Sequence, residues 1–283
     1  MTADTCLIDG VRVPRFLYGT AWKEEATARL TELALRTGFR GIDTANQRKH
    51  YFESAVGTGI AAAVTSGVVN RDNVFLQTKF TFRGGQDDRL PYDPKSAVAD
   101  QVRQSLDSSL AHLGTDFVDS LLLHGPTQRT GIAASDWEAW RAMEALHDRG
   151  RARLLGISNV SLDQLQVLCR GARVRPRFVQ NRCFANRGWD RGIREFCTRH
   201  GMIYQGFSLL TANLSTVRHP QVAQIALQHG RTPEQIVFRF ALDAGILPIT
   251  GTTSERHMQE DLAVLDFALT PDQVRCLAGL TQQ

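Results

Sequence analysis

The sequence predicts a (β/α)8 barrel of the TIM type, an α/β fold, with a small β-hairpin across the barrel floor. Eight short runs rich in β-branched and aromatic residues alternate with longer stretches of helical periodicity, as in a parallel sheet built from βα units. A chain of 283 residues has room for eight such units. No linker rich in Pro, Gly or Ser divides it, so we expect one domain over residues 1–283.

The eight strand candidates follow one another along the chain. They are residues 15–19, 39–43, 74–79, 117–124, 153–158, 178–183, 202–208 and 245–250. Between them lie helical periods such as SAVADQVRQSLDSSLAHLG and DWEAWRAMEALHDRG, each closed by a glycine, where a left-handed C-cap costs little. Ahead of the first strand, LIDGVRVPRF predicts the hairpin, with Asp9 and Gly10 as its turn.

Composition and charge argue against several classes of protein. The 33 basic and 29 acidic residues give a formal net charge of +4 and are interspersed, so no basic arm for nucleic acid is present. The start lacks the features of a signal peptide, and no apolar run is long enough to cross a bilayer. Five scattered cysteines without a C-x-x-C pattern disfavour a disulfide framework or a metal site. We expect a cytoplasmic protein without a nucleic-acid, membrane or obligate protein partner.

Polar side chains stand at the ends of consecutive predicted strands. Asp43, Lys79 and His124 end the second, third and fourth strands, Ser158 and Asn159 the fifth, and Gln180 and Asn181 lie in the sixth. Each alone has a structural explanation: Asp43 as a helix cap, Lys79 as a solvated strand end, His124 as a polar residue before a turn. In a barrel, however, the carboxyl ends of all strands surround one mouth. Their joint placement therefore predicts a site.

These residue types suit proton transfer at a carbonyl or alcohol oxygen. An ammonium such as that of Lys79 beside Tyr51 favours the phenolate, so we expect the phenol's pKa to fall from about 10 toward the working range. Asp43 would keep the lysine charged, and His124 would donate a hydrogen bond to a substrate oxygen. No nucleophile elbow or metal-ligand spacing is present. These side chains supply only protons, so a separate group must supply the electrons of a reduction.

At this point the sequence resembles the aldo-keto reductases over nearly its whole length. The segments that carry the resemblance, in order, are GFRGIDTA, VFLQTK, LLLHGP, LGISN, PRFVQN and ILPITGTTSERHMQEDLAVLDF. The resemblance implies a (β/α)8 barrel that binds NADPH, sometimes NADH, in extended form and reduces an aldehyde or ketone. It also implies a catalytic tetrad of Asp43, Tyr51, Lys79 and His124. In that tetrad Tyr51 is the proton donor, Lys79 and Asp43 tune it, and His124 orients the substrate.

The family pattern further implies a set of cofactor-binding positions. Ser158, Asn159 and Gln180 match those that hold the nicotinamide carboxamide, and Phe207 falls where an aromatic ring, commonly tyrosine, stacks on the nicotinamide. Trp22 is a candidate wall of the substrate pocket, with a core aromatic as the alternative. The complete implied cofactor set is Thr20, Ser158, Asn159, Gln180, Phe207, Ser208, Leu210, Gly251, Thr252, Thr253, Arg256, His257, Glu260 and Asp261.

The tyrosine departs from the family spacing. The family places it five positions after the aspartate, where this chain has Arg48, and the insert NQRKH moves Tyr51 to the eighth. Either the longer loop bulges and Tyr51 still reaches the site, or the tetrad is broken; we favour the first. We expect the basic residues of the insert, Arg48, Lys49 and His50, to face solvent at the edge of the mouth, where they would favour acidic substrates.

The residues expected at the cofactor phosphate are compatible with more than one cofactor. Gly251 and Thr252 stand where the family has a lysine and a serine, and Arg256 and His257 compete for the position of its arginine. The hydroxyls, amides and guanidinium of GTTSER are suitable phosphate donors, although this stretch also reads as a capped, charged helix start. We expect NADPH, with NADH or dual use as the alternative.

Two other functions are compatible with the sequence. The displaced tyrosine leaves room for a cofactor-binding redox-sensing or regulatory module with little turnover. A phosphate-binding isomerase or aldolase on the same fold would use Lys79 as a Schiff-base former, but it leaves Ser158 and the GTTSERHMQED segment without a purpose. The leading hypothesis is an NAD(P)H-dependent reductase of a small-molecule carbonyl substrate.

Overall fold

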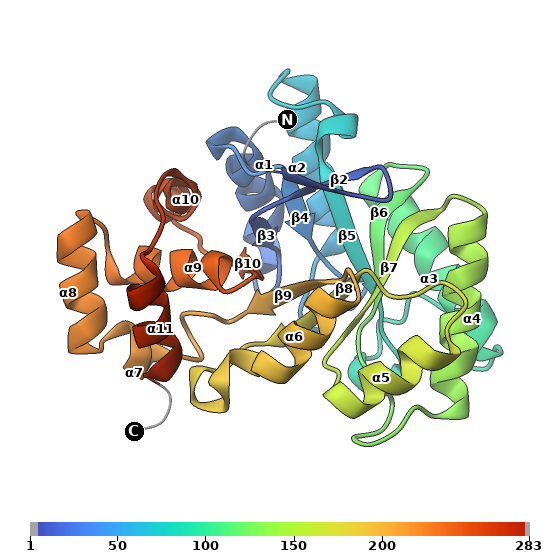
Figure 1. Cartoon of the computed structure of the whole chain (residues 1–283). Coiled ribbons are helices and arrows are strands. Elements are labelled where there is room, and N and C mark those ends of the chain that lie inside the picture. Colours follow the sequence, from blue (N-terminus) through green and yellow to red (C-terminus); the bar gives the residue numbers. More distant parts are fainter. Residues whose placement is uncertain (1–4, 281–283) are drawn as a thin grey trace.

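The structure, a computed structural model, describes residues 5–280. Eight parallel strands close into a barrel in the order β10-β3-β4-β5-β6-β7-β8-β9, so the first and the last of the eight are neighbours (Figure 1). This confirms the predicted fold class. The strands are β3 (Leu17–Gly19), β4 (Gly41–Asp43), β5 (Phe75–Phe80), β6 (Val118–Leu123), β7 (Ala152–Ser158), β8 (Phe178–Arg182), β9 (Ile203–Phe207) and β10 (Ile246–Thr250).

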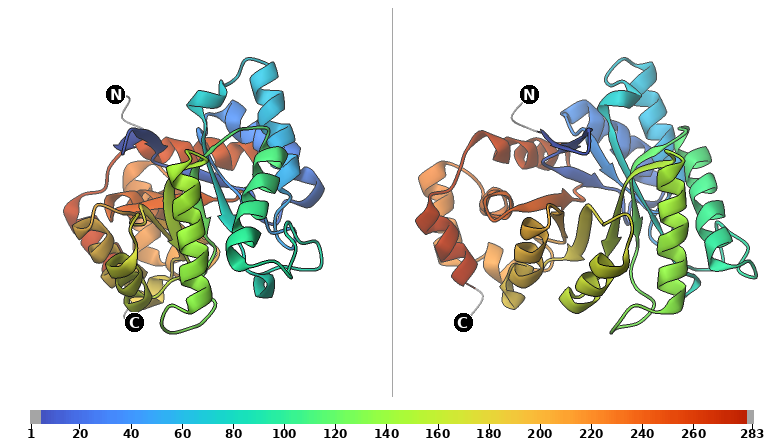
Figure 2. Two further views of the ribbon diagram at one scale, coloured as in Figure 1. Left: turned by 90° about the vertical axis from the view of Figure 1, so that its right-hand side faces the viewer. Right: turned by 45° about the vertical axis from the view of Figure 1, so that its right-hand side comes forward.

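Helices surround the barrel. Figure 2 shows α3 and α4 alongside the strands, and Figure 1 places α8 and α11 on the opposite side. Gly114 and Gly150 follow α3 and α4 with φ of 62° and 70°, as the sequence predicted. No helix within residues 5–280 is long and apolar enough to span a membrane. The helices are α1 (Thr27–Thr37), α2 (Glu53–Thr65), α3 (Val98–Leu113), α4 (Ala134–Asp148), α5 (Leu162–Gly171), α6 (Arg191–Arg199), α7 (Leu214–Val217), α8 (Pro220–His229), α9 (Pro233–Asp243), α10 (Glu255–Leu262) and α11 (Pro271–Gly279).

Each predicted strand overlaps an observed strand, and six of the eight observed strands are shorter than expected. β3 and β4 have three residues each and share two ladder positions, Tyr18 with Ile42 and Gly19 with Asp43. Residues 15 and 16 form a bend that carries the chain from the hairpin into the barrel wall, so β3 begins late.

The hairpin closes the floor of the barrel, as predicted. Strand β1 (Thr5–Ile8) pairs antiparallel with β2 (Val11–Pro14), and the turn residues Asp9 and Gly10 both have positive φ, 45° and 81°. This is the backbone of the tight hairpin turn that Asp-Gly favours. Val11 and Val13 pack into one apolar cluster with interior barrel residues, which are Leu17, Phe75, Leu122, Leu154, Phe178, Leu247 and Ile249.

Above this apolar floor the barrel interior becomes polar. The register of β8 on β9 pairs Phe178 with Ile203, then Gln180 with Gln205, then Arg182 with Phe207. Because side chains alternate along a strand, these three pairs stack from floor to mouth on the inner face. Amide side chains form the middle layer, and the top layer opens into a cavity.

Close contact between α2 and α3 generates a stability prediction. A Cβ added to Gly57 would lie 1.9 Å from the carbonyl oxygen of His112, so Gly57→Ala must force the helices apart. We expect the free energy of unfolding to fall by about 1–3 kcal/mol, measured by urea denaturation. Gly279→Ala is the control, since nothing lies within 4 Å of its added Cβ. A Gly57→Ala protein as stable as the wild type would contradict this packing.

Candidate active site

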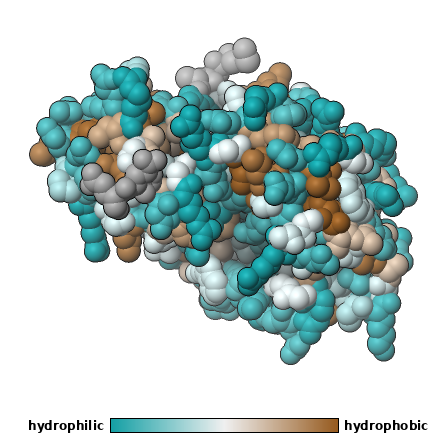
Figure 3. Space-filling view, turned by 60° about the horizontal axis from the view of Figure 1, so that its bottom comes forward, coloured by the Kyte–Doolittle hydropathy of each residue, from teal (hydrophilic) through white to brown (hydrophobic). Residues whose placement is uncertain are grey.

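A cavity of about 1240 Å³ opens at the carboxyl end of the barrel. Figure 3 faces this end and shows the surface hollowed near its centre. Most residues proposed from the sequence line it: Trp22, Asp43, Tyr51, His124, Ser158, Asn159, Gln180, Phe207, Ser208, Leu210, Gly251, Thr252, Arg256, His257, Glu260 and Asp261. Thr20, Lys79 and Thr253 do not line it.

A buried ion pair lies beneath the cavity. The Lys79 ammonium, at the end of β5, donates to both Asp43 carboxylate oxygens at 2.8 Å and to the Thr44 carbonyl oxygen at 2.8 Å. Burial alone would lower the pKa of Lys79, but the charge and hydrogen bonds of Asp43 outweigh burial and raise it. The ammonium therefore stays charged although its side chain is fully buried.

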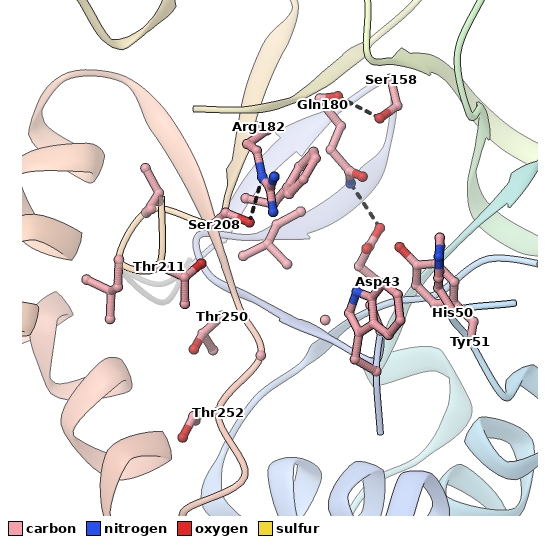
Figure 4. Close-up of a pocket in the computed structure, with 18 of the residues that line it drawn as sticks. Asp43, His50, Tyr51, Ser158, Gln180, Arg182, Ser208, Thr211, Thr250 and Thr252 are labelled. Carbon is pink, nitrogen blue, oxygen red and sulfur yellow. Dashed lines mark hydrogen bonds between the residues drawn. The ribbon is translucent and has the colours of Figure 1, made fainter. Parts of the chain in front are cut away.

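Asp43 is held by the amide layer of the barrel. Gln180 donates to its Oδ1 at 3.0 Å (Figure 4), and Gln77 donates to the same oxygen at 2.7 Å. Both glutamines also donate to the Gln205 side-chain oxygen at 2.9 Å. Gln205 donates back to Gln77 at 3.1 Å. A carboxylate with several donors cannot rotate without leaving buried donors unpaired. Asp43 is thus a fixed anchor for Lys79.

Tyr51 reaches this pair despite the insert. The Lys79 Nζ atom lies 5.2 Å from the centroid of the Tyr51 ring, and the His124 ring packs edge-on against Tyr51 with centroids 6.1 Å apart. Figure 4 shows Tyr51 beside Asp43 at one end of the cavity. The structure therefore brings all four tetrad positions together.

The extra residues of the insert are buried and hydrogen-bonded, which fixes the longer loop. Asn46 donates to the Ser105 carbonyl oxygen at 2.9 Å, and Gln47 donates to the Gly85 carbonyl oxygen. The Tyr51 amide donates to the Gln47 carbonyl oxygen at 3.0 Å, which turns the chain back toward the barrel. Anchored polar residues, rather than a shorter loop, set the position of the tyrosine.

The basic part of the insert differs from the expectation. Lys49 is exposed, as expected. Arg48 instead packs over the Phe52 ring at 4.1 Å and pairs with Glu24 at 3.4 Å. His50 lines the cavity and packs on the Trp22 ring with centroids 4.1 Å apart. The expectation that all three face solvent was wrong because Phe52 and Trp22 offer aromatic faces to two of them.

The expected direction of the Tyr51 pKa was also wrong. Burial raises the pKa of Tyr51, and this outweighs the lowering by Lys79, which the Asp43 charge further offsets. Since Asp43 neutralises the ammonium at hydrogen-bond distance, little net positive charge remains to stabilise a phenolate. Tyr51 therefore keeps its proton through neutral pH.

His124 is neutral in this site. Burial and the positive charge of Lys79 lower its pKa to about 3. Its Nδ1 lies 2.6 Å from the Thr81 hydroxyl. When that hydroxyl donates to Nδ1, the ring hydrogen is on Nε2. In that tautomer His124 is a hydrogen-bond donor without a charge.

The positions that the sequence suggested for the nicotinamide carboxamide have free acceptors. Gln180 and Asn159 use their side-chain N–H groups on protein partners, Asn159 donating to the His124 carbonyl oxygen at 2.8 Å. Neither side-chain oxygen receives a hydrogen bond within residues 5–280. The Ser158 hydroxyl donates to the Gln180 carbonyl oxygen at 2.7 Å. Asn159 also has a φ of 52°, a costly conformation for a non-glycine residue that points to a constrained position.

The turn after β9 presents unpaired donors to the cavity. Ser208 has a φ of 57°, and the amides of Leu209, Leu210 and Thr211 donate no hydrogen bond within the described residues. Arg182 reaches this turn, its Nε donating to the Ser208 hydroxyl oxygen at 3.3 Å (Figure 4). Successive free amides next to a guanidinium form an anion-binding concavity.

The far end of the cavity lies at the start of α10. Gly251, Thr252, Arg256 and His257 line it, and Arg256 pairs with Glu260 at 3.6 Å. Thr253 is exposed outside the cavity. Thr252 accepts a hydrogen bond from the Ser254 amide, which begins the cap of the helix.

Thr20 has a different place from the one implied by the family pattern. It is fully buried, and its hydroxyl donates to the Asp43 carbonyl oxygen at 3.1 Å. It therefore lies behind the cavity wall.

Among the cavity residues that were not singled out from the sequence, several carry polar or charged groups, including Lys23, His50, Thr81 and Arg182. Two signals were available. Arg182 follows Gln180 by two within β8 and shares its inner face, and Thr81 follows Lys79 by two, one residue past the end of β5. Lys23 and His50 lie on loops whose course no periodicity indicates. Within residues 5–280 no group of three or more His, Cys, Asp or Glu residues could hold a metal ion.

Comparison with known proteins agrees with this geometry. A model described as the aldo/keto reductase family matches residues 17–281. The chain belongs to this family. It is 28% identical to the uncharacterized oxidoreductase YtbE of Bacillus subtilis (strain 168) over 284 residues, covering 100% of this chain and 94% of that protein. It is 25% identical to prostaglandin F synthase 1 of Bos taurus over 307 residues, covering 98% of this chain and 90% of that protein.

Solved structures of aldo-keto reductases share the fold. The aldo/keto reductase of Brucella melitensis matches with a TM-score of 0.81 and 25% identity, covering 97% of this chain and 98% of that one. An aldo-keto reductase of Bombyx mori, solved in complex with NADP, matches with a TM-score of 0.83 and 24% identity, covering 98% of this chain and 92% of that one. As an aldo-keto reductase, the protein is an NAD(P)H-dependent oxidoreductase.

Asp261 gives a pH-dependent stability prediction. Burial raises its pKa from 3.8 to about 7, since the neighbouring Thr250 offsets little of the cost. The folded state thus binds a proton that the unfolded state releases above about pH 4, so stability falls as pH rises toward and through 7. We expect Asp261→Asn to raise the free energy of unfolding near pH 8, on the order of 2–4 kcal/mol, and to change it little near pH 4. Equal effects at both pH values would contradict a buried, ionisable Asp261.

Proposed function

We propose that this aldo-keto reductase reduces an aldehyde or ketone to an alcohol with NADPH, with Tyr51 as the proton donor. The observation that supports this best is the joint position of Tyr51, His124 and the Lys79–Asp43 pair at one end of a cavity that continues to a phosphate-suited end. A proton donor beside a hydrogen-bond donor is what a carbonyl oxygen needs as it gains negative charge.

Tyr51 acts as an acid in this proposal. Because burial raises its pKa, the phenol is fully protonated when a substrate binds. Lys79 then lies 5.2 Å from the ring centroid and stabilises the phenolate left after the proton moves to the substrate oxygen. Asp43 keeps Lys79 charged and in place. Positioned proton transfer of this kind contributes about 10²–10⁴-fold in rate.

His124 orients the substrate. As a neutral imidazole held through Thr81, it donates a hydrogen bond to the carbonyl oxygen without competing for the proton of Tyr51. A charged imidazolium would be repelled by Lys79. The two donors then hold the oxygen from two sides.

The cavity fits a nicotinamide dinucleotide. The free side-chain oxygens of Gln180 and Asn159 suit the carboxamide N–H groups, and the ring of Phe207 suits stacking. The free amides that follow Ser208 suit the diphosphate. When bound, the cofactor supplies the hydride. The residues of the chain hold it, exclude water and deliver the proton.

The reaction end of the cavity suits an uncharged, apolar carbonyl compound. Its lining includes Trp22, His50, Phe82 and Pro126, and none of these four side chains is a carboxylate or a guanidinium that would attract or repel a charged substrate. The Trp22 side chain is 69% exposed at the mouth, as a wall rather than a core residue. The sequence suggested that Arg48 would attract acidic substrates. Because its guanidinium packs on Phe52 and pairs with Glu24, it is not free to do so.

The redox-sensing alternative rested on a displaced tyrosine. That motivation weakens because Tyr51 lies beside Lys79 and His124. The Schiff-base alternative weakens too, since a lysine engaged by Asp43 and Thr44 and held charged is a poor nucleophile.

Removal of the Tyr51 hydroxyl tests the proton donor. We expect Tyr51→Phe to lower kcat for aldehyde reduction by at least about 10²-fold and to change the NADPH Kd by less than about threefold, because the hydroxyl acts on the substrate oxygen. Stopped-flow turnover and fluorescence titration measure the two. Tyr204→Phe is the control: its hydroxyl bonds Asp190 outside the cavity, so turnover should remain. Full activity in Tyr51→Phe would remove Tyr51 from the mechanism.

The pH profile is a second test. His124, with a pKa near 3, and Tyr51, with a raised pKa, both keep their protonation states across neutral pH. We expect kcat for reduction to stay level from about pH 6 to 9 and to fall only as the tyrosine loses its proton at higher pH. An inflection near pH 6.5 that disappears in His124→Gln would show that a charged imidazole does the work instead.

A further inference from the structure

We infer that the floor end of the barrel carries a second binding site, for a small molecule with more than one phosphate group. A cavity of about 440 Å³, the floor cavity, opens there, where the hairpin turn meets the start of β8. It shares no lining residue with the cavity at the carboxyl end, so this inference does not depend on the proposed function. Asp9 is the single carboxylate that lines it within residues 5–280, and its basic lining residues are Arg153, Arg173, Arg175, Arg177, His147 and His200.

The fold gathers these basic residues from four places in the chain. The segment RVRPR, residues 173–177, connects α5 to β8 and supplies three of the arginines. Arg153 lies near the start of β7, the strand that pairs with β8. His147 lies in the last turn of α4, and His200 directly follows α6. Basic groups that are far apart in the sequence thus line one cavity.

The connection from α5 to β8 is held in place by its backbone. The Val174 amide donates to the Glu144 carboxylate at 2.9 Å, and the Val174 carbonyl oxygen accepts a hydrogen bond from the Trp140 indole at 3.2 Å. The Arg177 amide donates to the Leu155 carbonyl oxygen at 2.7 Å. Because this connection is ordered in advance, it loses less conformational entropy when a ligand binds.

Two of the guanidinium groups are fixed in position but keep donors for a ligand. Arg177 uses its Nε and Nη2 atoms on the Asp9 carboxylate at 2.7 and 3.0 Å, which leaves Nη1. Arg153 packs over the Phe117 ring, 4.0 Å from its centroid, and uses Nη1 on Asp119 at 3.2 Å. Its Nε and Nη2 atoms have no hydrogen-bond partner in the described part of the chain. N–H donors therefore remain on groups that are already positioned.

Arg175 adds a positive charge that no carboxylate balances. Its guanidinium forms no ion pair or hydrogen bond within residues 5–280, whereas Arg173 binds Asp148 through two N–H groups at 2.6 and 3.2 Å. Four guanidinium groups around one concavity repel one another, and a concave surface concentrates the field of like charges. An anion in the cavity relieves that repulsion and gives Arg175 a partner.

The two histidines each have one ring nitrogen that the protein does not use. The Nδ1 atom of His147 donates to the Ala152 carbonyl oxygen at 3.1 Å, and that of His200 donates to the Phe196 carbonyl oxygen at 2.8 Å. The Nε2 atom of each ring has no partner among the residues that the structure describes. A protonated imidazole whose Nδ1 is engaged in this way donates from Nε2, which adds donors for an anion.

These donors suit phosphate groups. Guanidinium groups bind phosphate oxygens through paired hydrogen bonds, and a phosphate has oxygens on several sides for donors that come from different segments. The volume lies in the range of small-molecule sites, about 300–1,000 Å³, and exceeds what one inorganic phosphate needs. Four arginines also exceed the charge of one phosphate. The ligand class is therefore a compact molecule with several phosphate groups.

The test measures binding of tripolyphosphate by isothermal titration calorimetry to the full chain carrying one equivalent of NADP⁺, so that the cavity at the carboxyl end is filled. We expect one site with a Kd of about 10–100 μM near physiological salt. Arg175→Gln and Arg153→Gln should each weaken binding by about 5–20-fold, because charge-assisted hydrogen bonds are lost. Arg141→Gln is the matched control: this exposed arginine of α4 lines neither cavity, so the Kd should change by less than about twofold.

Three results would overturn the inference. The first is no binding of tripolyphosphate to the wild-type protein at concentrations up to about 1 mM. The second is equal weakening in Arg175→Gln and Arg141→Gln, which would reduce the effect to the general charge of the surface. The third is binding of citrate, a tricarboxylate, as tightly as tripolyphosphate, which would remove the preference for phosphate. Thermal melting followed by circular dichroism checks the fold of the variants; since Arg175 is exposed, its replacement should leave Tm unchanged.

Discussion

The site depends on one interaction, the buried ion pair of Lys79 and Asp43. A buried charge is tolerated only when it is paired and its remaining donors are satisfied, and removal of one partner costs about 3–5 kcal/mol. Here Gln77 and Gln180 complete the bonding of the carboxylate, and the Thr44 carbonyl oxygen completes that of the ammonium. The amide layer of Gln77, Gln180 and Gln205 in the middle of the barrel therefore holds this pair in place beneath the cavity.

The pair also explains why Tyr51 is an acid. A free ammonium would pull the phenol's pKa down, but the carboxylate cancels most of that field in the resting state, and burial raises the pKa. Electrostatic help from Lys79 then becomes useful as the phenol gives up its proton. The Lys79–Asp43 pair thus keeps the Tyr51 phenol protonated before the reaction. As the phenol gives up its proton, the Lys79 ammonium stabilises the developing phenolate in the transition state.

Strand periodicity made the fold and much of the site predictable. Eight apolar runs specified the barrel, and Asp43, Lys79 and His124 at successive strand ends specified one mouth. The loops were less predictable, because their course depends on tertiary hydrogen bonds. The burial of Asn46 and Gln47, which returns Tyr51 to the site, follows from partners far along the chain. The pKa direction of Tyr51 likewise depends on the depth of burial, which no residue spacing reveals.

The cavity has two ends of different character: a rigid reaction end above the Lys79–Asp43 pair, and a cofactor end where Arg182 lies beside the backbone amides that follow Ser208. The most direct test of the account is aldehyde-dependent loss of reduced-nicotinamide absorbance when purified wild-type protein is mixed with NADPH. We expect a steady loss of reduced-nicotinamide absorbance that requires the aldehyde and is faster with apolar aldehydes than with acidic ones. Tight NADPH binding without any aldehyde- or ketone-dependent loss would contradict it.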